Sequence, residues 1–201
     1  MSKVKICGLS RAEDIEAVNS ALPDYIGFVF AESHRRVDER TAAMLRKGLD
    51  ERIEVVGVFV NEDIKKVIGL YEDGIIDIVQ LHGDEGVDYT SRLRESCGSR
   101  IIKTAKVGNI LPCPPSNSDF LLFDSMSADR TGTGRIFDWH LIEGFDRLPY
   151  FLAGGLSAAN VQDAIGLLSP YAVDVSGGVE TRGVKDASKI KEFVDLVREA
   201  D

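Results

Sequence analysis

Short apolar segments alternate along the chain with stretches of helical periodicity, and this alternation limits the possible fold more than any other feature. Eight segments of four to six residues are rich in β-branched and aromatic side chains, which is typical of buried strands. They occupy residues 4–7, 25–30, 55–60, 76–81, 100–104, 120–124, 150–153 and 172–175. Their starts lie about 20 to 30 residues apart, which is the length of one strand-plus-helix unit.

The stretches between these segments contain helix-start signals. Ser10 with Glu13 forms a capping-box pattern and predicts a helix that continues through Val18. Ser157 and Asp186 each precede residues with apolar positions at helical spacing. Two intervals predict at most a short helix: residues 106–119 contain three prolines, and residues 138–143 allow barely two turns.

Eight such units in 201 residues predict an α/β protein, a single-domain (β/α)₈ barrel (TIM barrel) with compact loops that spans residues 1–201. The alternative is an open, doubly wound parallel sheet, which usually has fewer strands at this length. Apolar strands fit either fold, because both bury parallel strands on two faces. The number of units favours the barrel.

Charge and cysteine content exclude several classes of protein. The net charge of −9 argues against nucleic-acid binding, because the phosphates would be repelled. No apolar run approaches the roughly 20 residues that span a bilayer, and the N-terminus has no signal-peptide pattern. Three cysteines without framework spacing indicate reduced thiols. We therefore expect a cytoplasmic protein that binds neither membranes nor nucleic acid.

In a barrel of this kind the active site lies at the C-terminal ends of the strands. Cys7 ends the first segment, and a thiolate there can act as a base, although a strand-end cysteine alone often packs as a small hydrophobic residue. Asp124 ends the sixth segment, where partial desolvation favours the neutral, proton-donating carboxylic acid. Its alternative role is to cap the loop that follows.

Other polar residues follow the remaining segments. Arg35 and Arg36 can clamp a carboxylate or remain solvated loop charges. His82 can hydrogen-bond a substrate or cap the next helix. Asp174, between two valines, can accept hydrogen bonds from sugar hydroxyls or satisfy buried backbone donors.

Glycine-rich turns follow the seventh and eighth segments, where barrels recurrently bind phosphate. Gly154 with Gly155 forms the first turn, and Ser176 with Gly177 opens the second. Bare backbone amides in such turns bind phosphate without a basic side chain. The three histidines show no metal-ligand spacing, and no dinucleotide or P-loop motif is present.

In chain order, these segments resemble the strand motifs of the phosphoribosylanthranilate isomerase family of tryptophan biosynthesis. The similar motifs are KICGL at 5–9, GFVF at 27–30, VGVFVN at 56–61, VQLHG at 79–83, LFD at 122–124, GTG at 132–134, FDW at 137–139, LAGGL at 152–156 and AVDVSGGVE at 172–180. The resemblance covers essentially the whole chain, and the first and last motifs together are highly specific.

The resemblance implies an Amadori rearrangement of a small phosphorylated substrate without a cofactor or metal. Asp124 would be the general acid that opens the furanose ring to a Schiff base. Cys7 would then remove the proton from C2. An arginine would bind the anthranilate carboxylate; the family's Ser-x-Arg-x-Val spacing selects Arg35, whereas counting from the second strand selects Arg36.

The resemblance also implies that Asp174 and His82 contact the substrate, and that Gly154, Gly155, Ser176 and Gly177 line the phosphate site. Gly177 departs from the family, which usually has a second serine there, so a hydroxyl donor is missing while the backbone amide remains. Two alternatives stay open. One is the related isomerase of histidine biosynthesis, which has an aspartate in place of Cys7, and the other is a catalytically silent phosphate-binding barrel. The sequence does not predict whether the protein is a monomer or a homodimer.

Overall fold

The computed structural model describes residues 1–108, 117–125 and 136–200. Eight parallel strands form a closed barrel in chain order, because β1 pairs with β8 as well as with β2. The strands are β1 (Lys3–Cys7), β2 (Tyr25–Val29), β3 (Glu54–Phe59), β4 (Ile78–Leu81), β5 (Arg100–Val107), β6 (Phe120–Ser125), β7 (Tyr150–Leu152) and β8 (Ala172–Val175). The predicted barrel is confirmed, and the open doubly wound sheet is excluded.

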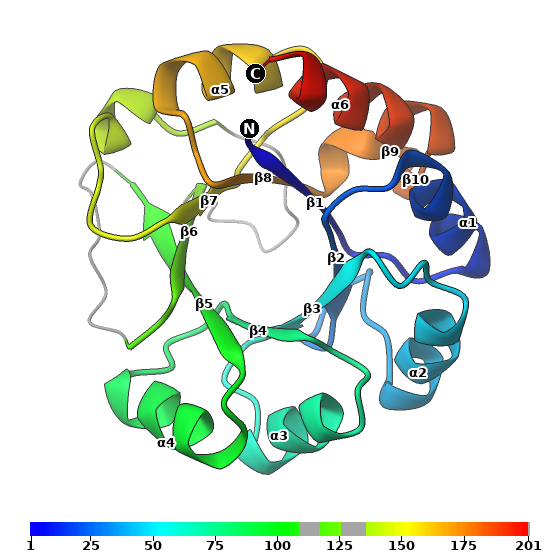
Figure 1. Cartoon of the computed structure of the whole chain (residues 1–201), viewed down its shortest axis with the longest axis vertical. Coiled ribbons are helices and arrows are strands. Elements are labelled where there is room, and N and C mark those ends of the chain that lie inside the picture. Colours follow the sequence, from blue (N-terminus) through cyan, green and yellow to red (C-terminus); the bar gives the residue numbers. More distant parts are fainter. Residues whose placement is uncertain (109–116, 126–135, 201) are drawn as a thin grey trace.

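The α-helices lie outside the ring of strands, as Figure 1 shows in a view along the barrel. Those described are α1 (Ala12–Ala21), α2 (Glu39–Lys47), α3 (Ile64–Glu72), α4 (Val87–Cys97), α5 (Val161–Leu168) and α6 (Ala187–Glu199). Each turns an apolar face toward the strands; Val18 on α1 and Phe193 on α6, for example, are fully buried. This burial is the main favourable contribution to folding.

Two of the predicted helix starts are wrong by a few residues. The residue at the N-cap of α1 is Arg11 rather than Ser10, and the carboxylate that accepts from the backbone N–H groups of Ser10 and Arg11 belongs to Asp14 rather than Glu13. Helix α5 begins after Asn160, whose side chain accepts from the backbone N–H of Ser157. In both cases a side-chain oxygen near the helix start accepts from backbone N–H groups at or before the N-cap, and the predicted serine is not the N-cap residue.

The structure also describes the predicted helix start at Asp186 and part of the two intervals expected to hold at most a short helix. Asp186 caps α6, as predicted, by accepting from the N–H groups of Ser188 and Lys189. Among the described residues 136–149 before β7, Trp139–Ile142 form a short 3₁₀ helix. The three prolines at 112, 114 and 115 lie outside the described residues, as does the third cysteine at 113.

Aromatic rings fill the barrel interior where the strands begin. Tyr25 and Phe151 have ring centroids 5.6 Å apart, and Phe120 lies 5.6 Å from Phe151 and 4.9 Å from Tyr171. The Lys3 ammonium lies over the rings of Tyr25 and Tyr171, at 5.3 and 5.4 Å. Such tilted ring pairs and cation–π contacts are favourable geometries. The N-terminal end of the barrel is therefore a packed aromatic layer.

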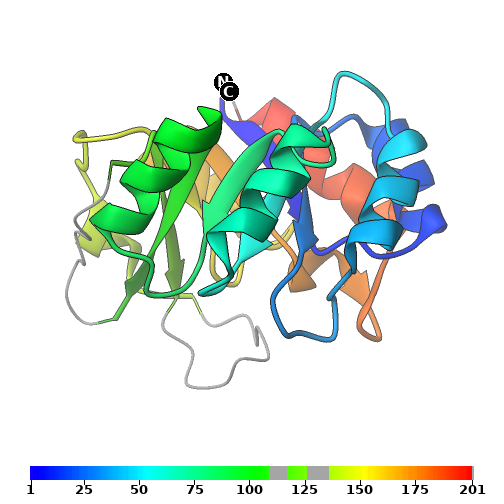
Figure 2. The ribbon, with the colours of Figure 1, turned by 90° about the horizontal axis from the view of Figure 1, so that it is seen from below.

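The opposite end of the barrel, where the strands finish, is called the mouth below. A small hairpin of β9 (Glu180–Thr181) and β10 (Val184–Lys185) follows β8 there. Figure 2 shows this hairpin, in orange, at the end of the molecule opposite the two chain termini. Its turn residues, Arg182 and Gly183, both have positive φ, as tight hairpin turns require. In the described part of the chain, no helix is long and apolar enough to cross a membrane.

Candidate active site

The strand register brings the predicted polar residues to the inside of the barrel near the mouth. Side chains alternate between the two faces of a strand, so Lys5 and Cys7 on β1 both point inward. Lys5 is the register partner of Asp174 on β8, and Cys7 is the partner of Gly27 on β2. Asp124 enters from the end of β6. The thiol and both carboxyl groups therefore face one interior space.

Two glycines, Gly27 and Gly8, leave space for the Cys7 side chain and for the residues around it. A Cβ atom at Gly27 would lie 2.6 Å from the Cys7 sulfur, so a side chain there would displace the thiol. Gly8 has a φ of +84°, and a Cβ atom there would lie 2.5 Å from Cδ of Arg35. The Ser176 hydroxyl donates to the Cys7 carbonyl at 2.9 Å. The backbone around the thiol is therefore held from β2, β8 and the loop after β2.

Burial inside the barrel raises the pKa of the Cys7 thiol above its usual value. The nearby ammonium group of Lys5 opposes this shift, the carboxylate of Asp174 adds to it, and Lys185 opposes it again. Cys7 thus lies among both cations and anions, and its protonation depends on their balance.

Lys5 and Asp174 form an ion pair in the barrel interior. Lys5 is 0% exposed, and its Nζ lies 2.8 Å from Oδ2 of Asp174. The other oxygen of Asp174, Oδ1, is buried and has no hydrogen-bond partner among the described residues. A buried acceptor without a partner is costly, so this oxygen is available to a hydroxyl group of a ligand.

Asp124 and His82 face one another across the mouth. Oδ2 of Asp124 lies 3.4 Å from Nε2 of His82, and Oδ1 accepts from the backbone N–H of Ser125 at 2.8 Å. Nδ1 of His82 lies 3.0 Å from both the Gln80 amide nitrogen and the Thr104 hydroxyl. If both donate to Nδ1, the neutral ring has its proton on Nε2, directed at Asp124. Asp124 remains 27% exposed, so water and a ligand can reach it.

Arg35, rather than Arg36, is the arginine whose side chain reaches the mouth. Its Nε and Nη2 donate to the two carboxylate oxygens of Glu180 at 2.7 and 2.9 Å, a bidentate pair. Its aliphatic part passes over Gly8, next to Cys7. The charge of Arg36 instead acts on Glu62 and Asp38.

Glu180 accepts from two cations. Besides Arg35, the Lys185 ammonium donates to it at 2.6 Å and to the Ser176 carbonyl at 2.9 Å. Burial alone would raise the pKa of Glu180, but the hydrogen bonds from Arg35 and Lys185 lower it to about 2. The hairpin residues Glu180 and Lys185 therefore connect the loop after β2 to the end of β8.

The two glycine-rich turns lie against one another. Gly154 and Gly155 have φ values of +85° and +73°, and a Cβ atom at Gly154 would come within 3.1 Å of the Asp124 carboxylate. A Cβ atom at Gly178 would lie 2.0 Å from the Leu156 carbonyl oxygen. Ser176 and Gly177 begin the short 3₁₀ helix Gly177–Val179. The turns that contain the predicted phosphate residues thus meet at one corner of the mouth.

Sequence reasoning assigned no role to several residues of this site. They are Lys5, Gln80, Thr104, Glu180 and Lys185. The available signal was a polar residue alternating with apolar ones inside a strand, as Lys5 does between Val4 and Ile6. In the described part of the chain, no group of three His, Cys, Asp or Glu side chains is arranged to hold a metal ion.

Comparisons with known proteins identify the family of this chain. The family model for N-(5'-phosphoribosyl)anthranilate (PRA) isomerase matches residues 4–196. An N-(5'-phosphoribosyl)anthranilate isomerase from Endomicrobium trichonymphae is 48% identical, and the match covers 98% of this chain and 99% of that protein. One from Caldanaerobacter subterraneus is 45% identical, with 98% of each chain covered.

Solved structures of phosphoribosyl anthranilate isomerases are also similar to this chain. Phosphoribosyl anthranilate isomerase from Thermotoga maritima superposes with a TM-score of 0.86 at 33% identity, covering 99% of this chain and 100% of that one. A phosphoribosyl anthranilate isomerase in complex with reduced 1-(o-carboxyphenylamino)-1-deoxyribulose 5-phosphate gives a TM-score of 0.83 at 32% identity, with the same coverage. The chain therefore belongs to the phosphoribosylanthranilate isomerase family.

Proposed function

We propose that this chain converts N-(5-phosphoribosyl)anthranilate to 1-(2-carboxyphenylamino)-1-deoxyribulose 5-phosphate, with Cys7 as the general base and Asp124 as the general acid. The observation that supports these roles is that the thiol and the carboxyl group face one interior space at the mouth. A family member has been solved with the reduced form of this product bound.

The proposed reaction has two proton-transfer stages. Asp124, which is partly exposed beside His82, donates a proton to the furanose ring oxygen, and the C1–O bond breaks to give a protonated Schiff base. Cys7 then removes the proton from C2, which gives an enolamine that tautomerises to the ketone. Neither stage requires a cofactor.

Substrate binding is assigned to the remaining predicted residues. Arg35 uses the guanidinium edge that faces away from Glu180 to bind the anthranilate carboxylate. Asp174 accepts from a ribose hydroxyl through Oδ1, and His82 contacts the substrate beside Asp124. Gly154, Gly155, Ser176 and Gly177 bind the phosphate through backbone amides, with the Gly177 amide sufficient in place of a serine hydroxyl.

The two alternatives differ from this proposal in specific ways. The related isomerase of histidine biosynthesis has an aspartate where this chain has Cys7, so the thiol argues against it. A silent binding barrel is free to lose the acid or the base, and this chain retains both. We further propose that the protein works in the cytoplasm on a small phosphorylated substrate, without nucleic acid or membrane partners.

The first test is the loss of phosphoribosylanthranilate fluorescence when the protein is added to this substrate, made in situ. We expect conversion by the wild type, and rates at least ~10²-fold lower for Cys7→Ala and for Asp124→Asn, as for a lost acid or base. Circular dichroism of each variant controls for folding. A folded wild type that leaves the substrate unchanged would contradict the proposed reaction, and a fully active variant would contradict that residue's role.

A further inference from the structure

Lys5 is a fully buried cation two residues before Cys7, on the same face of β1. It is 0% exposed, its Nζ lies 2.8 Å from Oδ2 of Asp174, and its positive charge acts to lower the pKa of the Cys7 thiol. Removing an ammonium group from water costs several kcal/mol, which these partners must offset. The mechanism described above gives Lys5 no role.

One reading of Lys5 is purely structural. The register pairs Lys5 with Asp174 where β1 meets β8, so the ion pair joins the first and last strands of the barrel. This reading accounts for the contact with Asp174 and predicts that Lys5 affects only stability. It gives no reason for the position of the ammonium group on the same face of β1 as the thiol that serves as the base.

The charges around Cys7 favour a second reading. Lys5 on β1, Lys185 on β10 and Arg35 in the loop after β2 supply three positive charges. Asp174 on β8 and Glu180 on β9 supply two negative charges, and Gly27 on β2 supplies none. These five groups carry one positive charge in excess, which offsets the negative charge of the Cys7 thiolate. Asp124 on β6 faces the same space and, as the proposed proton donor, is neutral before it acts and negative afterwards.

We propose that Lys5 is a positioning residue, whose ammonium group holds the Cys7 sulfur and stabilises the thiolate that removes the substrate proton. This inference rests on the proposed function. In the step concerned, the C2–H bond breaks and an S–H bond forms. The C–H electron pair becomes the C1=C2 double bond of the enolamine, and the iminium nitrogen takes the electron pair of the C=N bond. Lys5 keeps its own proton throughout.

The charges around Cys7 predict that replacing Lys5 and replacing Asp174 shift the pKa of the thiol in opposite directions. Burial raises the pKa of Cys7, Lys5 opposes that increase, and Asp174 adds to it. Replacing Lys5 by a neutral residue should therefore raise the thiol pKa further, and replacing Asp174 by a neutral residue should lower it. An opposite charge within hydrogen-bonding reach changes a pKa by about one to three units.

The test titrates the thiolate absorbance near 240 nm in the full chain, in the absence of substrate. Cys97 and Cys113 are first replaced by alanine, and the titration of the same protein carrying Cys7→Ala is subtracted to remove the tyrosinate absorbance, so that the difference reports on Cys7. We expect Lys5→Met to raise the midpoint by about one unit or more, and Asp174→Asn to lower it. A midpoint for Lys5→Met equal to that of the wild type would overturn the proposal, as would a higher midpoint for Asp174→Asn.

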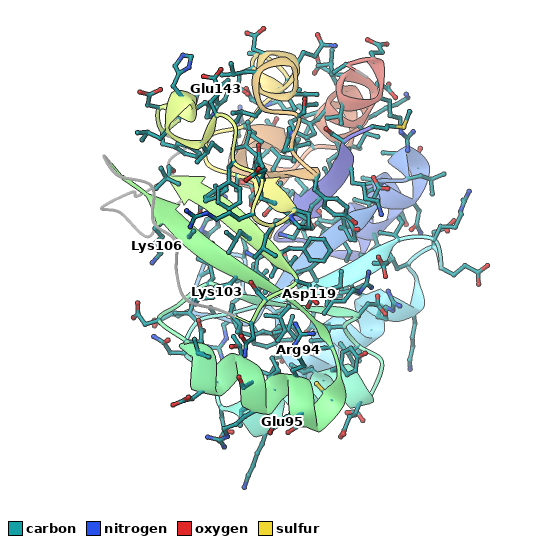
Figure 3. All side chains as sticks on the ribbon, turned by 60° about the vertical axis from the view of Figure 1, so that its left-hand side comes forward. Arg94, Glu95, Lys103, Lys106, Asp119 and Glu143 are labelled. Carbon is teal, nitrogen blue, oxygen red and sulfur yellow. The ribbon has the colours of Figure 1, made fainter. Side chains whose placement is uncertain are left out.

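Lys103→Met is the matched control. Lys103 on β5 is also a buried lysine paired with a carboxylate: its side chain is 4% exposed, and its Nζ lies 2.9 Å from Glu85. It alternates with the inward-facing Ile102 and Thr104, so its side chain points out of the barrel, toward Glu85; Figure 3 labels Lys103. Its loss should lower stability without moving the thiol midpoint. An equal shift in this variant would mean that any buried lysine produces the effect, which would overturn the proposal.

Lys5→Met leaves the buried Asp174 carboxylate without its cation, which lowers the stability of the folded variant, so a second variant is needed. If the single variant does not fold, Lys5→Met combined with Asp174→Asn removes both charges, and its midpoint is compared with that of Asp174→Asn alone. We expect the double variant to have the higher midpoint. Equal midpoints would overturn the proposal.

Turnover gives an independent readout. In Lys5→Met, kcat should fall about tenfold or more near neutral pH and approach the wild-type value at high pH, while KM changes little. A kcat lowered equally at all pH values would indicate the structural reading and overturn the proposal. The absorbance titration needs no substrate, so it decides on Lys5 even if the wild type fails to convert phosphoribosylanthranilate.

Discussion

At the scale of single residues, Gly27 determines how much space the Cys7 sulfur has. A methyl group at Gly27 would lie 2.6 Å from the sulfur, well inside van der Waals contact, so the thiol would have to move. We expect Gly27→Ala to lower kcat by about tenfold or more, because small misplacements of a reacting group are costly. Steady-state kinetics measures this effect. Gly69→Ala is a suitable control because no atom lies within 4 Å of its Cβ position, and it should leave kcat unchanged.

The two adjacent arginines allow a second test at this scale. Arg35→Lys keeps the charge but loses the planar fork that holds Glu180 and, in our proposal, the substrate carboxylate. We expect its KM for phosphoribosylanthranilate to rise at least about tenfold, since charge-assisted hydrogen bonds contribute about 1.5–3 kcal/mol. Arg36→Lys should keep KM near the wild-type value. The reverse result would assign carboxylate recognition to Arg36.

The candidate reactive residues are easier to find in the sequence than the residues that surround them. Cys7, Asp124 and Asp174 stand out because each ends or interrupts an apolar run at a predictable place in a barrel. Lys5 and Glu180 do not, because their partners are 169 and 145 residues away and meet them only when the barrel closes. Which residues form ion pairs inside a barrel depends on strand register, and short-range patterns do not contain that information.

At the scale of secondary-structure elements, the β9–β10 hairpin makes the stability of the mouth depend on pH. Glu180 has a pKa of about 2 in the folded protein, against about 4.3 in an unfolded chain. Its contribution to stability is therefore fully present above about pH 5 and is lost as the pH falls toward 2.

Urea denaturation at pH 6 and at pH 3 tests this dependence. The wild type should lose more stability between these pH values than Glu180→Gln, whose amide does not titrate in this range. Equal losses in the two proteins would show that the ion pairs of Glu180 with Arg35 and Lys185 contribute nothing measurable.

Strands were easier to predict than helix starts. Each barrel strand is buried on both faces, so its sequence is a nearly continuous apolar run that is visible without any tertiary information. A helix start depends on which oxygen reaches the free N–H groups, and several neighbouring side chains can compete for them. Asp14 replaced the predicted Ser10 and Glu13 pair for this reason.

At the scale of the whole molecule, the repetition of strand-plus-helix units predicted the barrel, and the hydrogen bonds between β1 and β8 confirm that it is closed. Closure places the C-terminal ends of all eight strands around one mouth, which is why residues from both ends of the sequence form one site. The extent of the chain as a single domain and the roles of the site residues remain predictions.

The aromatic layer at the other end of the barrel affects how substrate enters the site and how product leaves it. Tyr25, Phe120, Phe151 and Tyr171 fill the interior where the strands begin, so small molecules reach the reacting groups only from the mouth. The interior that holds the reacting groups is closed at its aromatic end and open at the mouth. Each product molecule leaves by the path along which the next substrate arrives, so the two compete for the same space, and turnover slows as product accumulates unless a following step consumes it.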